Sequence, residues 1–343
     1  MLNIGIIGLG SMGTTHLNAY AERKDVTVVA VADAKFASAG TQVGRAGNIP
    51  GQSGTIAIPA TATRYVTTTA LLADPAVEAV DICLPTLAHK DAALEAIRAG
   101  KHVLVEKPLA RTVADAREIA DAARASGVVL MPAHCMRFWP GWDWLKEAVT
   151  DGRFGAVQSA EFIRIGAKPP VPLYNDGAAC GGAHLDLHIH DTDFVLHLFG
   201  MPDAVTSFGR VGESGAIEHT FTHYHYKGGA LVTAEGAWTR DAEQRPFVMR
   251  YCVTFEQASV AFEFGTPPAL TLYQAGKEPQ AVALAPELGY EREIAEFVRC
   301  ATSGVNSEIA PPDAGFHAIE IIEAELRSIE SGTTQKLGAN SAQ

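Results

Sequence analysis

The feature that most constrains the fold is a glycine-rich turn between two apolar runs within the first 33 residues. The run from Leu2 to Ile7 (LNIGII) leads directly into residues 8–13, GLGSMG, which have the pattern G-x-G-x-x-G. A helix-compatible stretch follows, and a second apolar run, Val26 to Ala32, ends at Asp33, about 20 residues after the last glycine. Strand, turn, helix, strand and acid in this order predict a βαβ unit that binds a dinucleotide. A plain glycine-rich turn would require none of the flanking elements.

Each position of the turn has a physical task in this interpretation. Gly8 permits the tight turn, Gly10 lets the backbone approach a pyrophosphate, and Gly13 lets the helix pack close to the strand. The helix that starts at Ser11 and Met12 offers unpaired N–H groups and its positive dipole end to the phosphates.

Asp33 is expected to choose the cofactor. Its carboxylate lies where it can bind both hydroxyls of the adenosine ribose, and it would repel a 2′-phosphate by like charge. We therefore predict NAD, with NADP as the alternative, because Lys35 is near enough in sequence to reach a phosphate.

The bulk composition predicts a two-domain protein of the cytoplasm. A chain of 343 residues exceeds one comfortable core. The net charge of −12 argues against nucleic acid or an anionic membrane as the main partner. The first expected strand begins at residue 2, so no signal peptide is expected, and no apolar run reaches the length of a membrane span. Five scattered cysteines without C-x-x-C favour reduced thiols.

The predicted secondary structure changes in the middle of the chain. Up to about residue 131, apolar runs alternate with helical patterns, which predicts α/β architecture: a doubly wound parallel sheet of the Rossmann type over residues 1–131. Residues 40–63, rich in Gly, Ala and Thr, are expected to form a surface loop. Residues 132–343 are expected to form an α+β domain with a predominantly antiparallel sheet, because strand-like segments follow one another. These segments are 156–166, 203–211, 219–227, 230–239, 247–255 and 259–264.

Two segments at strand ends carry candidate site residues. Leu84, Pro85, Thr86 and His89 follow one expected strand, and Glu106-Lys107-Pro108 follows the next. Ligands of doubly wound sheets bind outside the carboxyl ends of strands, so this position places Lys107 at a cofactor crevice. The alternative is a lysine in an ordinary surface loop.

A further candidate pair lies in a stretch expected to be helical, residues 181–199. Asp186 and His190 are spaced i, i+4, so the carboxylate can orient the imidazole as a general acid or base. His184 and His188 have the same spacing, which leaves metal binding as an alternative. Neither H-E-x-x-H nor a C-x-x-C partner supports that alternative, so no metal is predicted.

Together these motifs resemble the Gfo/Idh/MocA oxidoreductases, the glucose–fructose oxidoreductase and inositol dehydrogenase group. The resemblance covers nearly the whole chain, from the glycine turn through AGKHV and EKP (residues 99–108) to G-G-x-x-x-D-x-x-x-H (residues 181–190). It implies a Rossmann domain and an α+β domain whose open sheet makes a homodimer or homotetramer. It also implies Lys107, Asp186 and His190 as the catalytic set. The cofactor-binding residues would be Gly8, Gly10, Ser11, Met12, Gly13, Asp33, Leu84, Pro85, Thr86, His89, Glu106 and Lys107.

The implied activity is hydride transfer between a nicotinamide ring and a secondary alcohol or ketone of a sugar, sugar derivative or cyclitol. Arg164 and Tyr174 are weak substrate candidates by the same resemblance. Many family members have glycine where this chain has His188, so an imidazole there would narrow the pocket or add a donor.

Two other function classes share the fold. NAD-dependent glycosidases oxidise a sugar transiently and eliminate the aglycone, and nucleotide-sensing regulators do not catalyse. A regulator would be expected to have lost the lysine or the histidine, whereas this chain retains Lys107, Asp186 and His190 together.

Overall fold

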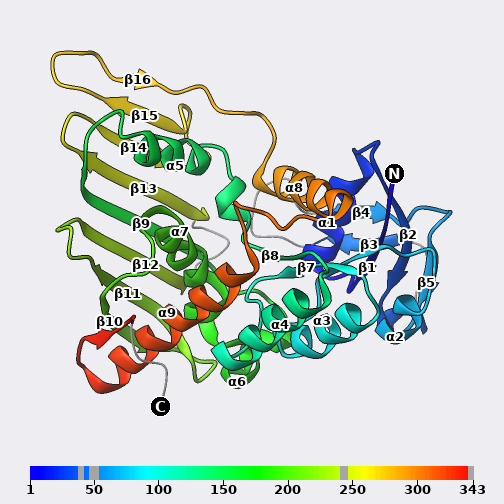
Figure 1. Cartoon of the computed structure of the whole chain (residues 1–343). Helices are drawn as coiled ribbons and strands as arrows, with labels where there is room; N and C mark the ends of the chain where they lie inside the picture. Colours follow the sequence, from blue (N-terminus) through cyan, green and yellow to red (C-terminus); the bar gives the residue numbers. More distant parts are fainter. Residues whose placement is uncertain (38–41, 46–53, 240–245, 339–343) are drawn as a thin grey trace. The chain divides into compact units, whose positions relative to one another are not determined.

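The computed structural model describes residues 1–37, 42–45, 54–239 and 246–338, which fall into two compact units (Figure 1). The first unit comprises Met1–Phe138 and Glu287–Phe316, and the second comprises Trp139–Pro286 and His317–Gln343. This division differs from the single boundary expected after residue 131. A late segment of the chain packs into the first unit, which sequence alternation alone does not reveal.

The first unit contains a six-stranded, wholly parallel sheet, as the alternating pattern predicts. The glycine turn follows the strand formed by residues 2–7. The strand formed by the second apolar run, residues 26–32, lies next to it in the sheet. In spatial order the strands are β5 (Thr63–Tyr65), β2 (Val26–Ala32), β1 (Leu2–Ile7), β6 (Ala79–Ile82), β7 (His102–Glu106) and β8 (Leu130–Ala133).

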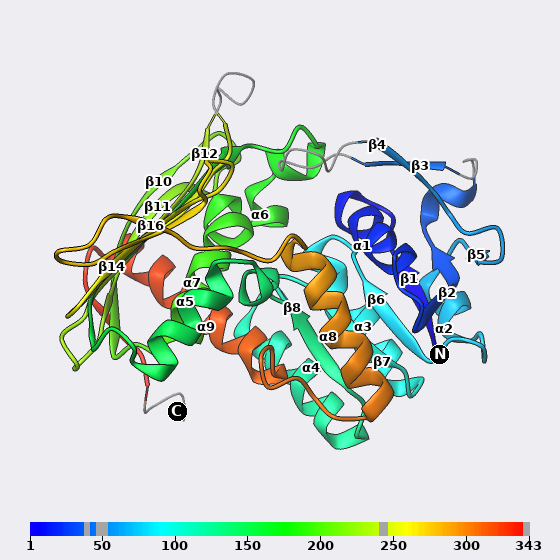
Figure 2. The same cartoon turned by 90° about the horizontal axis from the view of Figure 1, so that it is seen from above.

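Helices cover both faces of this sheet (Figure 2). On one face α1 (Ser11–Ala21) packs beside α8 (Gly289–Ser303), and on the other lie α2 (Thr68–Leu72), α3 (His89–Arg98) and α4 (Val113–Ser126). Helix α4 is capped at both ends: the Thr112 hydroxyl accepts from the Asp115 N–H, and Gly127 ends the helix with φ of 73°. No helix in the described ranges has the length and apolarity needed to cross a lipid bilayer.

The expected loop at residues 40–63 is partly wrong. Two short strands, β3 (Gln42–Arg45) and β4 (Gly54–Ala57), pair antiparallel there and lie against α1. Strands of four residues are too short for a period of two to stand out in the sequence. Residues 38–41 and 46–53 lie outside the described part of the chain.

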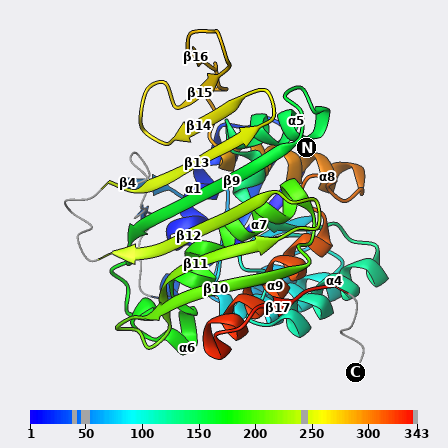
Figure 3. The same ribbon diagram turned by 90° about the vertical axis from the view of Figure 1, so that its left-hand side faces the viewer.

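The second unit contains a nine-stranded sheet in which only the β9–β12 pair, among the described strands, is parallel (Figure 3). This confirms the predicted open, predominantly antiparallel sheet. Its spatial order is β16 (Gln280–Ala281), β15 (Leu270–Tyr273), β14 (Ser259–Glu263), β13 (Val248–Phe255), β9 (Val157–Ala167), β12 (Leu231–Thr239), β11 (Ile217–His225), β10 (Ala204–Val211) and β17 (Gln335–Lys336).

One face of this sheet is covered by helices and an aromatic core. The α-helices of the second unit are α5 (Trp142–Asp151), α6 (Gly177–Cys180), α7 (Ile189–Phe199) and most of α9 (Pro312–Ser331). Trp142, fully buried, meets the rings of Phe194 and Tyr251 edge-on at 4.7 and 5.3 Å. Such pairs add to the stabilisation that burial alone provides.

The other face carries mixed side chains and is not covered by any described helix (Figure 3). Phe208 and Phe221, which are paired across β10 and β11, are exposed there. The ring of His219 lies 2.8 Å from the Glu235 carboxylate on β12. On β11 the exposed or partly exposed residues His219, Phe221, His223 and His225 alternate with buried residues, so this face of the strand is a half-exposed sheet surface.

Candidate functional site

The glycine turn is built by close backbone packing at two positions and by open space at the third. A Cβ on Gly13 would lie 1.9 Å from the Gly8 carbonyl oxygen, and one on Gly8 would lie 2.7 Å from the Cys83 carbonyl oxygen. Gly8 also has φ of +90°, which side-chain-bearing residues rarely adopt. A Cβ on Gly10 would meet no atom within 4 Å. The space beside Gly10 is therefore what a pyrophosphate approaching the backbone requires.

The helix that follows presents its N-terminus to this space. Helix α1 begins at Ser11, its cap residue Gly10 has no side chain, and no acidic residue lies in its first turn. The first N–H groups and the dipole of α1 thus suit an anion.

Asp33, at the end of β2, organises the turn. Its Oδ2 accepts the Leu9 N–H at 2.8 Å, and its Oδ1 accepts the Lys35 N–H at 2.8 Å. A carboxylate oxygen can accept more than one hydrogen bond, so both oxygens retain capacity for ribose hydroxyls.

His89 lies where the sequence places it, after the strand that ends at residue 82. It begins α3, after the short 3₁₀ turn Thr86–Ala88, and is buried. Its Nδ1 lies 2.8 Å from the Pro108 carbonyl oxygen and its Nε2 2.7 Å from that of Leu84. Burial lowers the pKa of His89, and the two carbonyls oppose this effect. With both nitrogens facing carbonyl oxygens, His89 ties together the loops after β6 and β7.

Lys107 stands out by exposure. Between Val103 and Ala110 it alone has partly exposed surface, and the bond that joins it to Pro108 is cis. Glu106, before it, is buried, and its Oε2 accepts the Lys107 backbone N–H at 3.0 Å. Lys107 is thus a cation held at the carboxyl end of β7.

Asp186 and His190 stand out in the same way in the second unit. Asp186 lies in a π-helical turn, His184–His188, and His190 lies in α7, which follows that turn directly. From residue 182 to residue 195 only Asp186 and His190 have partly exposed surface. The sequence predicted a single helix over 181–199. The structure differs from this prediction because residues 184–188 form a π-helical turn. Such turns are frequent at functional sites.

His184 and His188 face the interior, so the expectation that His188 narrows a pocket is wrong. His184 contacts the Thr220 hydroxyl at 3.1 Å through Nδ1, and His188 Nε2 lies 3.3 Å from Glu325 Oε2. The backbone of Gly236 on β12 leaves room for the His188 ring, because a Cβ there would lie 2.7 Å from the His188 Cβ.

Among the residues that the structure describes, one group has its ligand atoms within metal-binding distance, and it does not include these two histidines. It consists of His16, Asp81 and Cys83. These atoms already bond one another: His16 Nδ1 lies 2.8 Å from Asp81 Oδ2, and the Cys83 thiol donates to Asp81 Oδ1 at 3.2 Å. The sequence motifs gave no signal for this cluster.

The two weak substrate candidates lie in packed surroundings. Arg164 is buried and makes a bidentate pair with Asp191, at 2.8 and 3.0 Å, above the Trp142 ring. This argues against direct substrate contact. Tyr174 packs edge-on against Trp238 with ring centroids 5.6 Å apart, and it is partly exposed.

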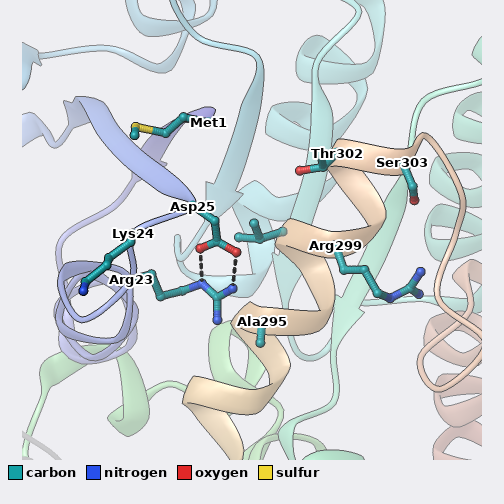
Figure 4. Close-up of a pocket in the computed structure, with 9 residues that line it drawn as sticks. Met1, Arg23, Lys24, Asp25, Ala295, Arg299, Thr302 and Ser303 are labelled. Atoms are coloured by element: carbon teal, nitrogen blue, oxygen red, sulfur yellow. Dashed lines mark hydrogen bonds and ion pairs between the residues drawn. The ribbon is translucent and has the colours of Figure 1, made fainter.

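A cavity of about 700 Å³ lies at the opposite edge of the first unit's sheet, where β1 and β2 begin (Figure 4). Arg23 and Asp25 on its wall are paired with each other, and Arg299 is paired with Glu296. The cavity is remote from the carboxyl strand ends where dinucleotides bind. It contains none of the candidate residues.

Comparison with known proteins identifies the family. The model of the Gfo/Idh/MocA oxidoreductase family with NAD-binding Rossmann fold matches residues 2–134, and that of the Gfo/Idh/MocA C-terminal domain matches residues 142–261. The chain belongs to the Gfo/Idh/MocA family.

Its relatives include proteins named for sugar and cyclitol chemistry. A 1,5-anhydro-D-fructose reductase from Ensifer adhaerens is 32% identical over 179 residues, 49% of this chain and 53% of that protein. A myo-inositol 2-dehydrogenase from Thermotoga maritima is 27% identical over 238 residues, 67% of this chain and 66% of that protein. The first match thus spans about half the length of that Gfo/Idh/MocA relative.

A solved structure described as levoglucosan dehydrogenase in complex with NADH and levoglucosan has a TM-score of 0.80. It is 20% identical, with 98% of this chain and 99% of that chain covered. At that identity the likeness shows the shared Gfo/Idh/MocA fold.

The glycine turn yields a paired prediction. Gly10→Ala should leave the melting temperature within about 2–3 °C of the parent, because Gly10 has room and an ordinary φ of −75°. It should weaken NADH binding roughly tenfold or more, because the new methyl group stands where the pyrophosphate approaches. Gly13→Ala should instead lower the free energy of unfolding by about 1–3 kcal/mol through overpacking. NADH titration by fluorescence and thermal melts test both; parental NADH affinity in Gly10→Ala would contradict the assignment.

Proposed function

We propose that this protein is an NAD-dependent oxidoreductase that transfers hydride between the nicotinamide and a secondary alcohol or ketone of a sugar, sugar derivative or cyclitol. One observation carries the proposal: in a buried stretch of the second unit, only Asp186 and His190 reach the surface, one turn apart. An acid–imidazole pair so presented suits proton transfer. The names of the relatives support the substrate class.

The nicotinamide would supply the hydride chemistry, and the protein would supply placement and proton handling. In the oxidising direction His190 accepts the proton of the substrate hydroxyl. Lys107 binds the same oxygen and stabilises the negative charge that develops on it. Asp186 orients the hydroxyl and the His190 ring. In the reducing direction His190 returns the proton.

The cofactor is proposed to be NAD because of Asp33. We expect kcat/KM for NAD to exceed that for NADP by about tenfold or more, since the carboxylate repels a 2′-phosphate. Asp33→Asn should narrow this ratio, whereas Asp121→Asn, at an exposed position of α4, should leave it unchanged. A parent enzyme with the higher specificity constant for NADP would show that Asp33 does not choose the cofactor.

Lys107 is proposed to be catalytic. Lys107→Ala should keep the melting temperature and NADH affinity but lose roughly 10²–10⁴-fold in turnover, the usual size of an oxyanion or proton-transfer contribution. Lys24→Ala, which removes an exposed lysine at the opposite edge of the sheet, is the matched control. Absorbance at the NADH band with a panel of polyols and sugars measures turnover. A glycosidase would instead give product without a net change in NADH absorbance. Turnover of Lys107→Ala within a few-fold of the parent would show that Lys107 is not catalytic.

His190 is proposed to be the base, which gives a pH signature. Imidazole must be neutral to accept a proton and ordinarily titrates near pH 6.5, so oxidation should rise with pH through the neutral range. Carbonyl reduction should favour lower pH. His190→Asn should depress turnover strongly and flatten the neutral limb, whereas His197→Asn, on the same helix, should keep it. An intact limb in a folded His190→Asn protein would move the proton-transfer role to another residue.

We also infer a homo-oligomer, a dimer or a tetramer, formed through the open face of the second unit's sheet. Apolar side chains on that face, among them Phe208, Phe221 and Leu231, are exposed in the single chain. Exposed patches of this kind are costly to leave in water.

A further inference from the structure

A chain of three charged side chains lies beneath the glycine turn of the first unit. His16, on α1, has its Nδ1 2.8 Å from Asp81 Oδ2 on β6 and its Nε2 3.3 Å from Glu106 Oε1 at the end of β7. His16 and Asp81 are fully buried, and Glu106 is 6% exposed. One imidazole is thus hydrogen-bonded to one carboxylate and forms an ion pair, without hydrogen-bond geometry, with a second carboxylate from the neighbouring strand.

The surroundings favour the charged forms. Burial alone would lower the pKa of His16, but Asp81 and Cys83 raise it well above its usual value. Burial alone would raise the pKa of Glu106, but His16 and then Lys107 hold it below its usual value. These interactions favour an imidazolium at His16 and a carboxylate at Glu106.

The remaining neighbours do not reverse this assignment. From α8 the Tyr290 ring lies 6.2 Å from the His16 ring, and the buried Glu293 adds a further acid near Tyr20 of α1. His89 adds a weaker favourable interaction with Glu106. No second cation among these groups takes the place of His16 between the two acids.

The second oxygen of Glu106 reaches Lys107. Glu106 Oε2 accepts the Lys107 backbone N–H at 3.0 Å while Oε1 faces His16. His16 belongs to the helix whose N-terminus suits the cofactor phosphates. A short path therefore runs from the phosphate-binding helix, through Glu106, to the backbone of Lys107.

We propose that His16 is a positioning residue for Lys107: its imidazolium holds the Glu106 carboxylate in the orientation that fixes the Lys107 backbone. This inference rests on the proposed function for the role of Lys107. Without the imidazolium two buried carboxylates would lack their shared cation, and an unpaired buried charge is strongly unfavourable. Glu106 would then take a proton, and the Lys107 N–H would lose its charged acceptor.

The first experiment compares His16→Gln with Tyr20→Phe. Tyr20 shares the helix and the burial of His16 and lies near Asp81, but its neutral phenol supplies no positive charge to Glu106. His16→Gln should lower kcat about 10- to 100-fold, the range that the loss of one charge-assisted hydrogen bond, from the Lys107 N–H to Glu106, represents. NADH affinity, measured by fluorescence, should stay within about threefold. Tyr20→Phe should match the parent in both; parental kcat in a folded His16→Gln protein would overturn the proposal.

The second experiment is a double-mutant cycle on kcat with Glu106→Gln. If His16 acts through Glu106, adding His16→Gln to Glu106→Gln should change kcat less than about twofold. The double variant loses one positive and one negative charge, so it leaves fewer unpaired buried charges than His16→Gln alone. If His16→Gln alone fails to fold, the comparison of the double variant with Glu106→Gln still tests the proposal. Additive losses in the cycle would overturn the path through Glu106.

A third measurement needs no turnover. In protein labelled with ¹³C at glutamate side-chain carboxyls, the Glu106 signal is the one that Glu106→Gln removes. At pH 6 it should report a carboxylate in the parent and move toward the protonated form in His16→Gln. An unmoved signal contradicts the inference, whereas a parent inert toward the whole substrate panel contradicts the proposed function instead.

Discussion

The first unit depends on the contact between Gly13 and the carbonyl of Gly8, where even one added carbon would lie 1.9 Å from an oxygen. This contact sets how closely α1 follows β1, and therefore where the N-terminus of α1 points. It also brings His16, one turn further along α1, over the ends of β6 and β7, where Asp81 and Glu106 lie. A backbone constraint in the first turn thus places both the anion-binding end of the helix and the buried charges beneath it.

In both units the side chains that we propose to be catalytic are exposed in the same way. Lys107 and the pair Asp186 and His190 are partly exposed residues within stretches that are otherwise buried. Buried neighbours such as Arg164 with Asp191, or His188 with Glu325, anchor these stretches through polar contacts. A side chain held this way loses little further freedom when it binds a ligand, which favours precise catalysis.

Much of this was readable from the sequence because it depends on local signals. Glycines, a following helix and the acid at Asp33 predict the dinucleotide unit, and the strands of the second sheet follow from a period of two. The sequence could not reveal that His89 and Arg164 are held by distant partners, since Pro108 and Asp191 meet them only through the fold. Nor could it reveal the π-turn or the packing of His188 against Gly236. The His16 cluster was missed because a histidine on the buried side of a helix has no motif of its own.

The discontinuous first unit has a consequence for how the chain reaches its structure. Helix α8 contributes Ile294, Phe297 and Val298 to the same buried cluster as Leu2 and Ile4 of β1. Domains usually fold as units in the order of synthesis. Here the apolar face of the first sheet must wait for residues made after nearly the whole second unit. During synthesis, the part of that face that α8 covers in the finished protein therefore lacks this cover until residues 289–303 have been made.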